Sequence, residues 1–239
     1  SVQLHLLESW VVVRTQLWAL MYDGYLGVIG IARNTPGPFG AIPGIFFARA
    51  GKIEKNRILQ AKGVDYSINR LIGDSKQATI YKNGTFATIY LSPKDYHRVH
   101  IPVDGQLLST RYIPGELFSV NQKTTEALPG LFARNERLVC HFRSQQIGDF
   151  SVIFVGAMLV AGIETVWGGF EQPGPGAVRE TDFSSEGKNF SKGDEIGRFK
   201  FGSTVIMLFQ DDAITLDSHI TSSTNVKMGE KIAVLSTKN

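Results

Sequence analysis

The sequence predicts an α+β fold that is mostly β, a compact barrel-like or sandwich-like domain with a few short helices. Glycine accounts for 25 of the 239 residues, which favours many tight turns. From Gly51 onward, short runs of β-branched and aromatic residues alternate with Gly, Pro, Asn or Asp, as is typical of strands and the turns between them. Helical patterns are few and short. This length suffices for one sizeable hydrophobic core.

Each element is predicted from its local pattern. Runs rich in Val, Ile, Phe and Tyr predict strands at 78–81, 86–91, 138–142, 150–160, 204–209 and 232–235. Short helices are predicted at 56–60, 67–72 and 122–128. Two glycine turns, Gly193-Asp194 and Gly229-Glu230, each lie between a basic residue and an apolar run, and we expect hairpins there.

The N-terminal part has a different character. Residues 6–32 are apolar and aromatic but are interrupted by Glu8, Arg14 and Asp23, so no charge-free stretch reaches the roughly 20 residues that span a bilayer. Helical spacing predicts an apolar helix, which could lie in a membrane interface or pack as an ordinary or dimer-forming helix. Residues 34–44 are rich in proline and glycine and are predicted to be a linker.

Composition excludes several classes of protein. Hydrophobic residues make up 43% and charged residues 20%, which excludes a disordered or collagen-like chain. A net charge of +3 is too small for a dedicated nucleic-acid binder, so no nucleic acid is expected as a partner, although the charge tolerates an anionic lipid surface. The single cysteine, Cys140, excludes an intrachain disulfide.

Only two histidines cluster, His97 and His100, in the run Tyr-His-Arg-Val-His. Two residues three apart share one face of a turn or helix but point to opposite faces of a strand. A zinc hydrolase would recruit Cys140 or His141 as a further ligand, but the spacing matches no established zinc pattern, and no metal is predicted.

The other notable element is the run 199–206, which contains Gly202, Ser203 and Thr204. Taken alone it indicates a strand with one glycine, in which both hydroxyl groups find local hydrogen bonds. The G-x-S-x-G elbow of α/β-hydrolases is absent, which argues against that class of enzyme.

Six long blocks of sequence connect these two elements. They are 51–67, 83–105, 112–121, 131–137, 155–167 and 192–206. In these blocks the chain resembles the phosphatidylserine decarboxylase family, from Gly51 almost to the C-terminus. The resemblance predicts a catalytic domain over 51–239, preceded by an atypical apolar segment and linker over 1–50.

The resemblance implies a proenzyme that cuts itself between Gly202 and Ser203 into chains 1–202 and 203–239. Ser203 would become a covalent pyruvoyl group, so neither a metal nor pyridoxal phosphate is needed. By position, His100 matches the family's base for self-cleavage and His97 matches a histidine implicated in acid/base work during decarboxylation. The pyruvoyl group would form a Schiff base with phosphatidylserine and release carbon dioxide and phosphatidylethanolamine.

The expected partners follow from the same resemblance. They are the substrate phosphatidylserine, a membrane surface, the other self-cleaved chain and a second copy in a homodimer. The expected location is the bacterial inner membrane or the mitochondrial inner membrane.

The chain departs from the family at one point. The family has a catalytic-triad aspartate in a Pro-x-Asp-Gly motif just before the first block, whereas residues 41–50 here contain no acid. Three explanations remain open: another carboxylate such as Asp104 takes its place, the segment before Gly51 comes from an altered reading frame, or self-cleavage is impaired. The alternative function is therefore an unprocessed, catalytically impaired lipid-binding homologue.

Overall fold

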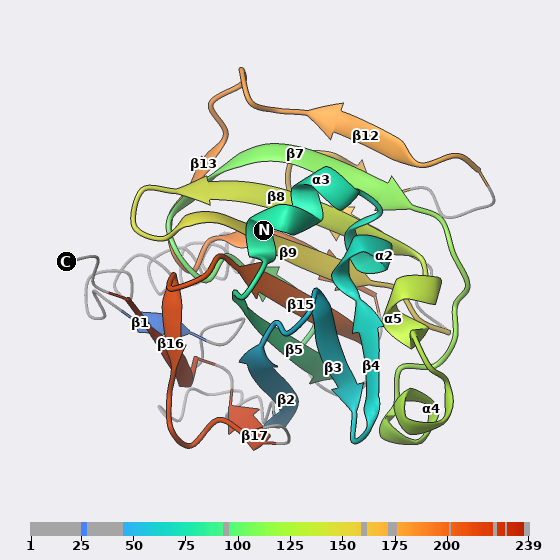
Figure 1. The fold of residues 1–239 in the computed structure, drawn as a ribbon. Helices are drawn as coiled ribbons and strands as arrows, with labels where there is room; N and C mark the ends of the chain where they lie inside the picture. Colours follow the sequence, from blue (N-terminus) through green and yellow to red (C-terminus); the bar gives the residue numbers. More distant parts are fainter. Residues whose placement is uncertain are drawn as a thin grey trace, which may run out of the picture.

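The computed structural model describes residues 25–27, 45–92, 96–158, 162–171, 176–200, 202–221, 224–227 and 229–236. Within these ranges the chain is a sheet-rich α+β fold with few short helices, as predicted (Figure 1). The described strands form separate sheets and do not close into a barrel.

The largest sheet has nine strands and antiparallel pairings throughout. Its order is β12 (Arg179–Asp182), β7 (Gly105–Ile113), β8 (Arg137–Ser144), β9 (Gly148–Val155), β15 (Ser203–Phe209), β5 (Thr85–Leu91), β2 (Ile45–Lys52) and β17 (Thr224–Lys227), with β13 (Asn189–Phe190) also beside β7. The central strand β15 is buried at all its positions.

Three smaller sheets complete the fold. The four-stranded sheet contains, in order, β11 (Gly169–Phe170), β10 (Ile163–Thr165), β14 (Glu195–Phe199) and β6 (Arg98–His100). The three-stranded sheet contains β1 (Tyr25–Gly27), β18 (Lys231–Leu235) and β16 (Ile214–Leu216). The two-stranded sheet contains β3 (Arg57–Ala61) and β4 (Val64–Ser67). The helices are α2 (Ile68–Ile72), α3 (Ser75–Ala78), the 3₁₀ helix η1 (Thr79–Tyr81), α4 (Gln122–Ala127) and α5 (Leu131–Arg134).

The nine-stranded sheet has two differently covered faces. On the face we call the helix face, the Arg137 guanidinium donates to the carbonyl of Leu71 in α2, and Figure 1 shows α2 and α3 in front of β8 and β9. On the opposite face, which carries the side chain of Ser203 and is called the site face, the rings of Phe154 and Phe199 lie 5.4 Å apart. The small sheet that contains β14 therefore packs on the site face.

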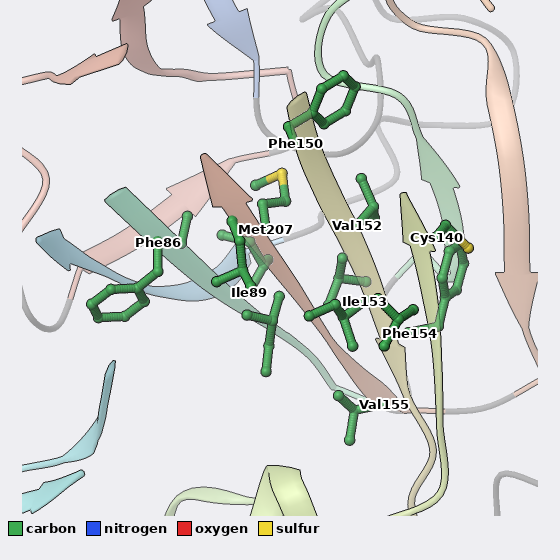
Figure 2. Packing of buried hydrophobic residues seen from close by; sticks show 14 of the residues in the cluster. Phe86, Ile89, Cys140, Phe150, Val152, Ile153, Phe154, Val155 and Met207 are labelled. Carbon is green, nitrogen blue, oxygen red and sulfur yellow. The ribbon is translucent and has the colours of Figure 1, made fainter. Parts of the chain in front are cut away.

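Apolar side chains of β5, β15, β9 and β8 fill the centre of the core (Figure 2). On the site face an aromatic row crosses three strands: the rings of Phe142 and Phe150 stack at 5.3 Å, and those of Phe150 and Phe209 at 6.2 Å. Trp167 and Phe190 meet Phe142 edge-on at 6.2 Å. Such pairs stabilise the sheet beyond the area that they bury.

Several predicted elements are confirmed. Strands form at 86–91, 138–142, 204–209 and 232–235 within two residues of the predicted bounds, and the strand predicted over 150–160 ends at Val155. Helices α2 and α4 occupy the segments predicted as 67–72 and 122–128.

Two local predictions were wrong. Residues 57–61 form β3 rather than a helix, because Lys55 and Asn56 adopt positive φ angles of 48° and 63° that open a turn incompatible with a right-handed helix. Residues 78–81 form the end of α3 and η1 rather than a strand. Asp74 caps α3 at the Gln77 amide, and the 3₁₀ turn continues that helix.

The glycine turns do not join hairpins. Gly193 and Gly229 adopt positive φ angles of 92° and 75°, as tight turns require. However, β13 pairs with β7 while β14 pairs with β10 and β6, and β17 pairs with β2 while β18 pairs with β1 and β16. Each turn therefore carries the chain from one sheet to another.

The predicted linker at 34–44 and most of the predicted apolar helix at 6–32 lie outside the described residues. The one described piece of that segment, Tyr25–Gly27, is the strand β1, paired with β18, and is not helical. Among the residues that the structure describes, no helix is long and apolar enough to cross a bilayer.

The close packing of the two sheets depends on Gly197. A Cβ there would lie 2.6 Å from the Glu164 carbonyl oxygen and 3.0 Å from the Phe154 ring. We expect Gly197→Ala to lower the free energy of unfolding by about 1–3 kcal/mol through overpacking, measured by urea titration. Gly176→Ala is the matched control because a Cβ there meets nothing within 4 Å, and it should change stability by less than about 0.5 kcal/mol. Equal losses in both variants would contradict this account.

Candidate active site

Ser203 is the first residue of β15 and lies at the centre of the fold. Its side chain is 0% exposed, and its Oγ has no hydrogen-bond partner among the described residues. It lies opposite Leu91 of β5, and on the other side the β15–β9 register, continued by one residue, brings it opposite Gly156. The hydroxyl group is therefore desolvated and is available for chemistry or for a ligand.

The histidine-bearing strand β6 reaches Ser203 through β14. Strands β6 and β14 are antiparallel, and the Phe199 amide donates to the His97 carbonyl at 3.0 Å. Phe199 ends β14 and lies only four residues before Ser203 in the chain. The two elements singled out in the sequence thus lie at one junction, where the small sheet joins the large one.

Both ring nitrogens of His100 are hydrogen-bonded. Nδ1 lies 2.7 Å from the Gly193 carbonyl oxygen, and Nε2 lies 2.8 Å from the Tyr96 hydroxyl. A carbonyl can only accept, so Nδ1 carries the proton, and Nε2 of the neutral ring accepts from Tyr96. Burial raises the pKa of Tyr96 to about 12, so this hydroxyl keeps its proton at neutral pH.

The environment of His100 favours the neutral ring. The residue is 7% exposed, and burial lowers its pKa, opposed by its hydrogen bond to Gly193 and by the charge of Glu195. The Tyr96 and His100 rings also stack, with centroids 5.8 Å apart. The His100 ring is therefore held in place, and its neutral form is favoured.

No carboxylate takes the place of the family's triad aspartate at His100 among the described residues. Asp104, the candidate considered from the sequence, is exposed and accepts from the Lys192 amide at 2.6 Å, so it holds the turn before Gly193 rather than the imidazole. The orienting acceptor is the Gly193 carbonyl. Sequence reasoning singled out Gly193 only as a turn, and it missed Tyr96 although that tyrosine begins the histidine cluster.

His100 and Ser203 are not hydrogen-bonded to each other in this state. The Nε2 lone pair is engaged by Tyr96, and Ser203 Oγ has no hydrogen-bond partner among the described residues. A proton transfer between them requires that His100 Nε2 give up its hydrogen bond with Tyr96 and form one with Ser203.

The ligand set of a zinc hydrolase is not assembled. His141 lies on the helix face, where its Nδ1 is 3.1 Å from the Tyr81 hydroxyl and 3.4 Å from Ser151 Oγ. Cys140 is buried in β8, and burial raises the pKa of its thiol. Within the described ranges, no three His, Cys, Asp or Glu side chains could together hold a metal ion.

A band of charged side chains borders the junction on the small sheet. Arg98 pairs with Glu195 at 2.5 Å, and Arg198 pairs with Glu164 at 2.5 Å. Lys200 lies 4.7 Å from the centroid of the Phe170 ring. Cations next to an exposed aromatic ring suit an anionic, partly apolar ligand.

Comparison with known proteins identifies the chain's relatives. The profile of the family described as "Phosphatidylserine decarboxylase" matches residues 44–234. The phosphatidylserine decarboxylase proenzyme of Acinetobacter baylyi is 49% identical over 185 residues, which cover 77% of this chain and 63% of that protein. The proenzyme of Alcanivorax borkumensis is 48% identical over 194 residues, covering 80% and 66% respectively. That of Dechloromonas aromatica is 46% identical over 184 residues, covering 76% and 65%.

The match spans a little under two thirds of the length of these relatives. It includes His97, His100 of β6, the connection from β14 to β15, and Ser203. The chain belongs to the phosphatidylserine decarboxylase family.

Proposed function

We propose that this chain is a self-processing proenzyme that decarboxylates phosphatidylserine to phosphatidylethanolamine, a carboxy-lyase whose prosthetic group is made from Ser203. The observation that carries the proposal is the position of Ser203, a buried hydroxyl without a hydrogen-bond partner among the described residues. It begins the central strand of a chain in this family, at the junction with the histidine-bearing sheet.

The residues around position 203 fit a pyruvoyl group. Conversion of serine to a ketone removes the hydroxyl group. No hydrogen bond to a described residue is lost in this conversion, because the Ser203 hydroxyl makes none. The burial of the position excludes bulk water from an electrophilic carbonyl. When formed, the pyruvoyl group supplies a ketone for condensation with a primary amine and an electron sink for the loss of carbon dioxide.

In self-cleavage, Ser203 Oγ attacks the carbonyl carbon of Gly202 while neutral His100 Nε2 takes the hydroxyl proton. Gly202 has no Cβ and leaves its carbonyl open to this attack. The peptide becomes an ester, elimination releases the chain 1–202 with a free carboxylate, and hydrolysis of the remaining dehydroalanine takes up water and releases ammonia. The pyruvoyl group then begins the chain 203–239.

In turnover, His97 is the proposed donor and acceptor of protons. It precedes β6, and its carbonyl is fixed by the Phe199 amide, four residues before position 203. A neutral or protonated imidazole can exchange protons near neutral pH. Lys200 lies in the adjoining band, and its ammonium group suits the phosphate of a phospholipid.

The remaining partners are also proposals. A diacyl phospholipid substrate is met at a bilayer, so we propose a membrane surface as the working site, at a bacterial or mitochondrial inner membrane. From the family resemblance we also propose that the chain forms a homodimer. The two self-cleaved chains are proposed to stay together.

The first test is cleavage itself. We expect intact-mass spectrometry of the purified protein to show chains 1–202 and 203–239, the smaller without a free N-terminal amine. Ser203→Ala should abolish both cleavage and decarboxylation, because no other hydroxyl replaces its oxygen. Thr88→Val, which removes another buried hydroxyl without a hydrogen bond to a described residue, should leave cleavage intact.

The second candidate function is an unprocessed lipid-binding homologue. It is favoured because no acid among the described residues is hydrogen-bonded to His100, and because Nε2 is engaged by Tyr96. An uncut chain that binds phosphatidylserine vesicles without releasing labelled carbon dioxide would support it and contradict the first proposal.

The pH dependence of cleavage tests the role of His100. The base acts in its neutral form, and burial lowers the pKa of His100. As the pH is lowered, the cleavage rate should therefore still be unchanged at the ordinary histidine pKa of about 6.5 and should fall only at more acidic pH. Tyr96→Phe removes a hydrogen-bond donor that stabilises the neutral ring. The fall of the cleavage rate on the acid side of the pH profile, its acid limb, should therefore move to higher pH by about 0.5 to 1 unit.

Tyr81→Phe provides the control for that experiment, because its hydroxyl also meets a histidine, His141, but on the helix face. It should leave the acid limb of the cleavage rate in place. Identical pH profiles for Tyr96→Phe and the unmodified chain would remove His100 from the proposed role.

A further inference from the structure

A buried carboxyl group lies on the same face of the sheet as Ser203. Glu136, just before β8, is 3% exposed, and its Oε1 has no hydrogen-bond partner among the described residues. Its backbone pairs with Gly156, whose amide donates to the Glu136 carbonyl at 2.8 Å. Glu136 lies in the shared block 131–137, but no role was assigned to it there, and the proposed mechanism does not use it.

The register places Glu136 and Ser203 in one row. The β8–β9 register continues to Glu136 opposite Gly156, and the β15–β9 register continues to Ser203 opposite Gly156. Directly opposite residues of antiparallel strands point to the same face. Two strand spacings separate the backbones of Glu136 and Ser203 by about 10 Å, with only a glycine between them.

Gly156 places no side chain between the two buried oxygen atoms, Ser203 Oγ and Glu136 Oε1, and we call the position over this glycine the notch. A Cβ on Gly156 would lie 3.4 Å from Leu117 Cδ2 and 3.7 Å from Glu136 Cβ. Leu117 packs over Gly156 and is 38% exposed, so a ligand would reach the notch by displacing this side chain. Asn135 fixes its floor, since its amide group donates to the carbonyls of Gly156 and Phe118, each at 2.8 Å.

We propose that Glu136 binds the ammonium group of an aminophospholipid head group in this notch and takes its proton, so that a neutral amine lies beside position 203. This proposal rests on the proposed function and specifies how the substrate of that reaction is recognised. The proton moves from the ammonium nitrogen to Oε1, and the nitrogen keeps the electron pair of the broken N–H bond. No other bond changes, and no co-reactant is needed.

The surroundings of Glu136 suit a proton acceptor. Burial raises the pKa of its carboxyl group, opposed by the nearby Tyr112 hydroxyl and by the charge of Arg179, while Glu171 adds to the increase. Arg179 is itself occupied, since it lies over the Tyr112 ring at 4.0 Å and pairs with Glu171 at 3.4 Å. An incoming ammonium therefore meets a carboxylate oxygen that no cation already holds among the described residues.

The test compares two short-chain lipids that differ in their head groups. Dihexanoyl phosphatidylethanolamine carries the amine, and dihexanoyl phosphatidylglycerol does not. Each is titrated into the purified protein, and affinity is measured from the shift in thermal midpoint, which requires no turnover. The cut and uncut fractions are determined by intact mass in every sample.

Glu136→Gln keeps the shape of the side chain but cannot accept the proton, and it should reduce the preference for the amine lipid about tenfold to a hundredfold. Gly156→Ala should reduce it as well by filling the notch. Glu116→Gln is the matched control, an exposed carboxylate whose backbone carbonyl accepts from the Glu136 amide, and it should keep the preference. A structural role for Glu136 would weaken the binding of both lipids equally.

Two outcomes overturn the assignment: the unmodified protein binds both lipids equally, or the preference survives Glu136→Gln. The proposed function fails separately. A chain that prefers the amine lipid through Glu136 but never cuts or decarboxylates contradicts the function and supports the amine site. A chain that cuts and decarboxylates while Glu136→Gln keeps the preference contradicts the amine site alone.

Discussion

The candidate site depends on the register of β15 between β5 and β9. All seven buried residues of β15 pair with β5, and six of them, from Thr204 onward, also pair with β9. The aromatic row that ends at Phe209 holds the far end of the strand. Side chains alternate along a strand, so a shift of one residue would turn Ser203 onto the helix face and away from β14. Core packing at one end of the strand therefore determines which groups the hydroxyl at the other end can meet.

If the chain is cut as proposed, the position of the cut between β14 and β15 determines which contacts hold the two products together. A cut between Gly202 and Ser203 severs the only covalent link between the two products, yet β15 stays paired with β5 and β9. The smaller chain also contributes β17 beside β2 and β18 beside β1. Separation would break pairings in two sheets and expose a central strand, so the fold itself holds the two chains together.

The sequence predicted the β-rich class, most core strands and the two elements that meet at the junction, because these depend on local composition and on long blocks shared with a family. It could not predict the segment after Asn56, where positive φ angles override helical composition, or the change of sheet at Gly193. It also missed Glu136. A charged residue next to a buried strand has no local signal, and its position opposite Ser203 arises only from the register of three strands.

The acceptor at His100 explains how a chain without the triad aspartate could still process itself. The Gly193 carbonyl fixes the tautomer and the ring as a carboxylate would, but it carries no charge to stabilise an imidazolium. In serine proteases the loss of the orienting aspartate costs about 10⁴-fold in rate. Self-cleavage happens once in the life of a molecule, so a slow step there still yields active enzyme, whereas the same loss in each turnover would not be tolerated. A neutral acceptor therefore suits a residue used once. On the proposed function the repeated proton transfers are those of His97 and, on the further inference, of Glu136.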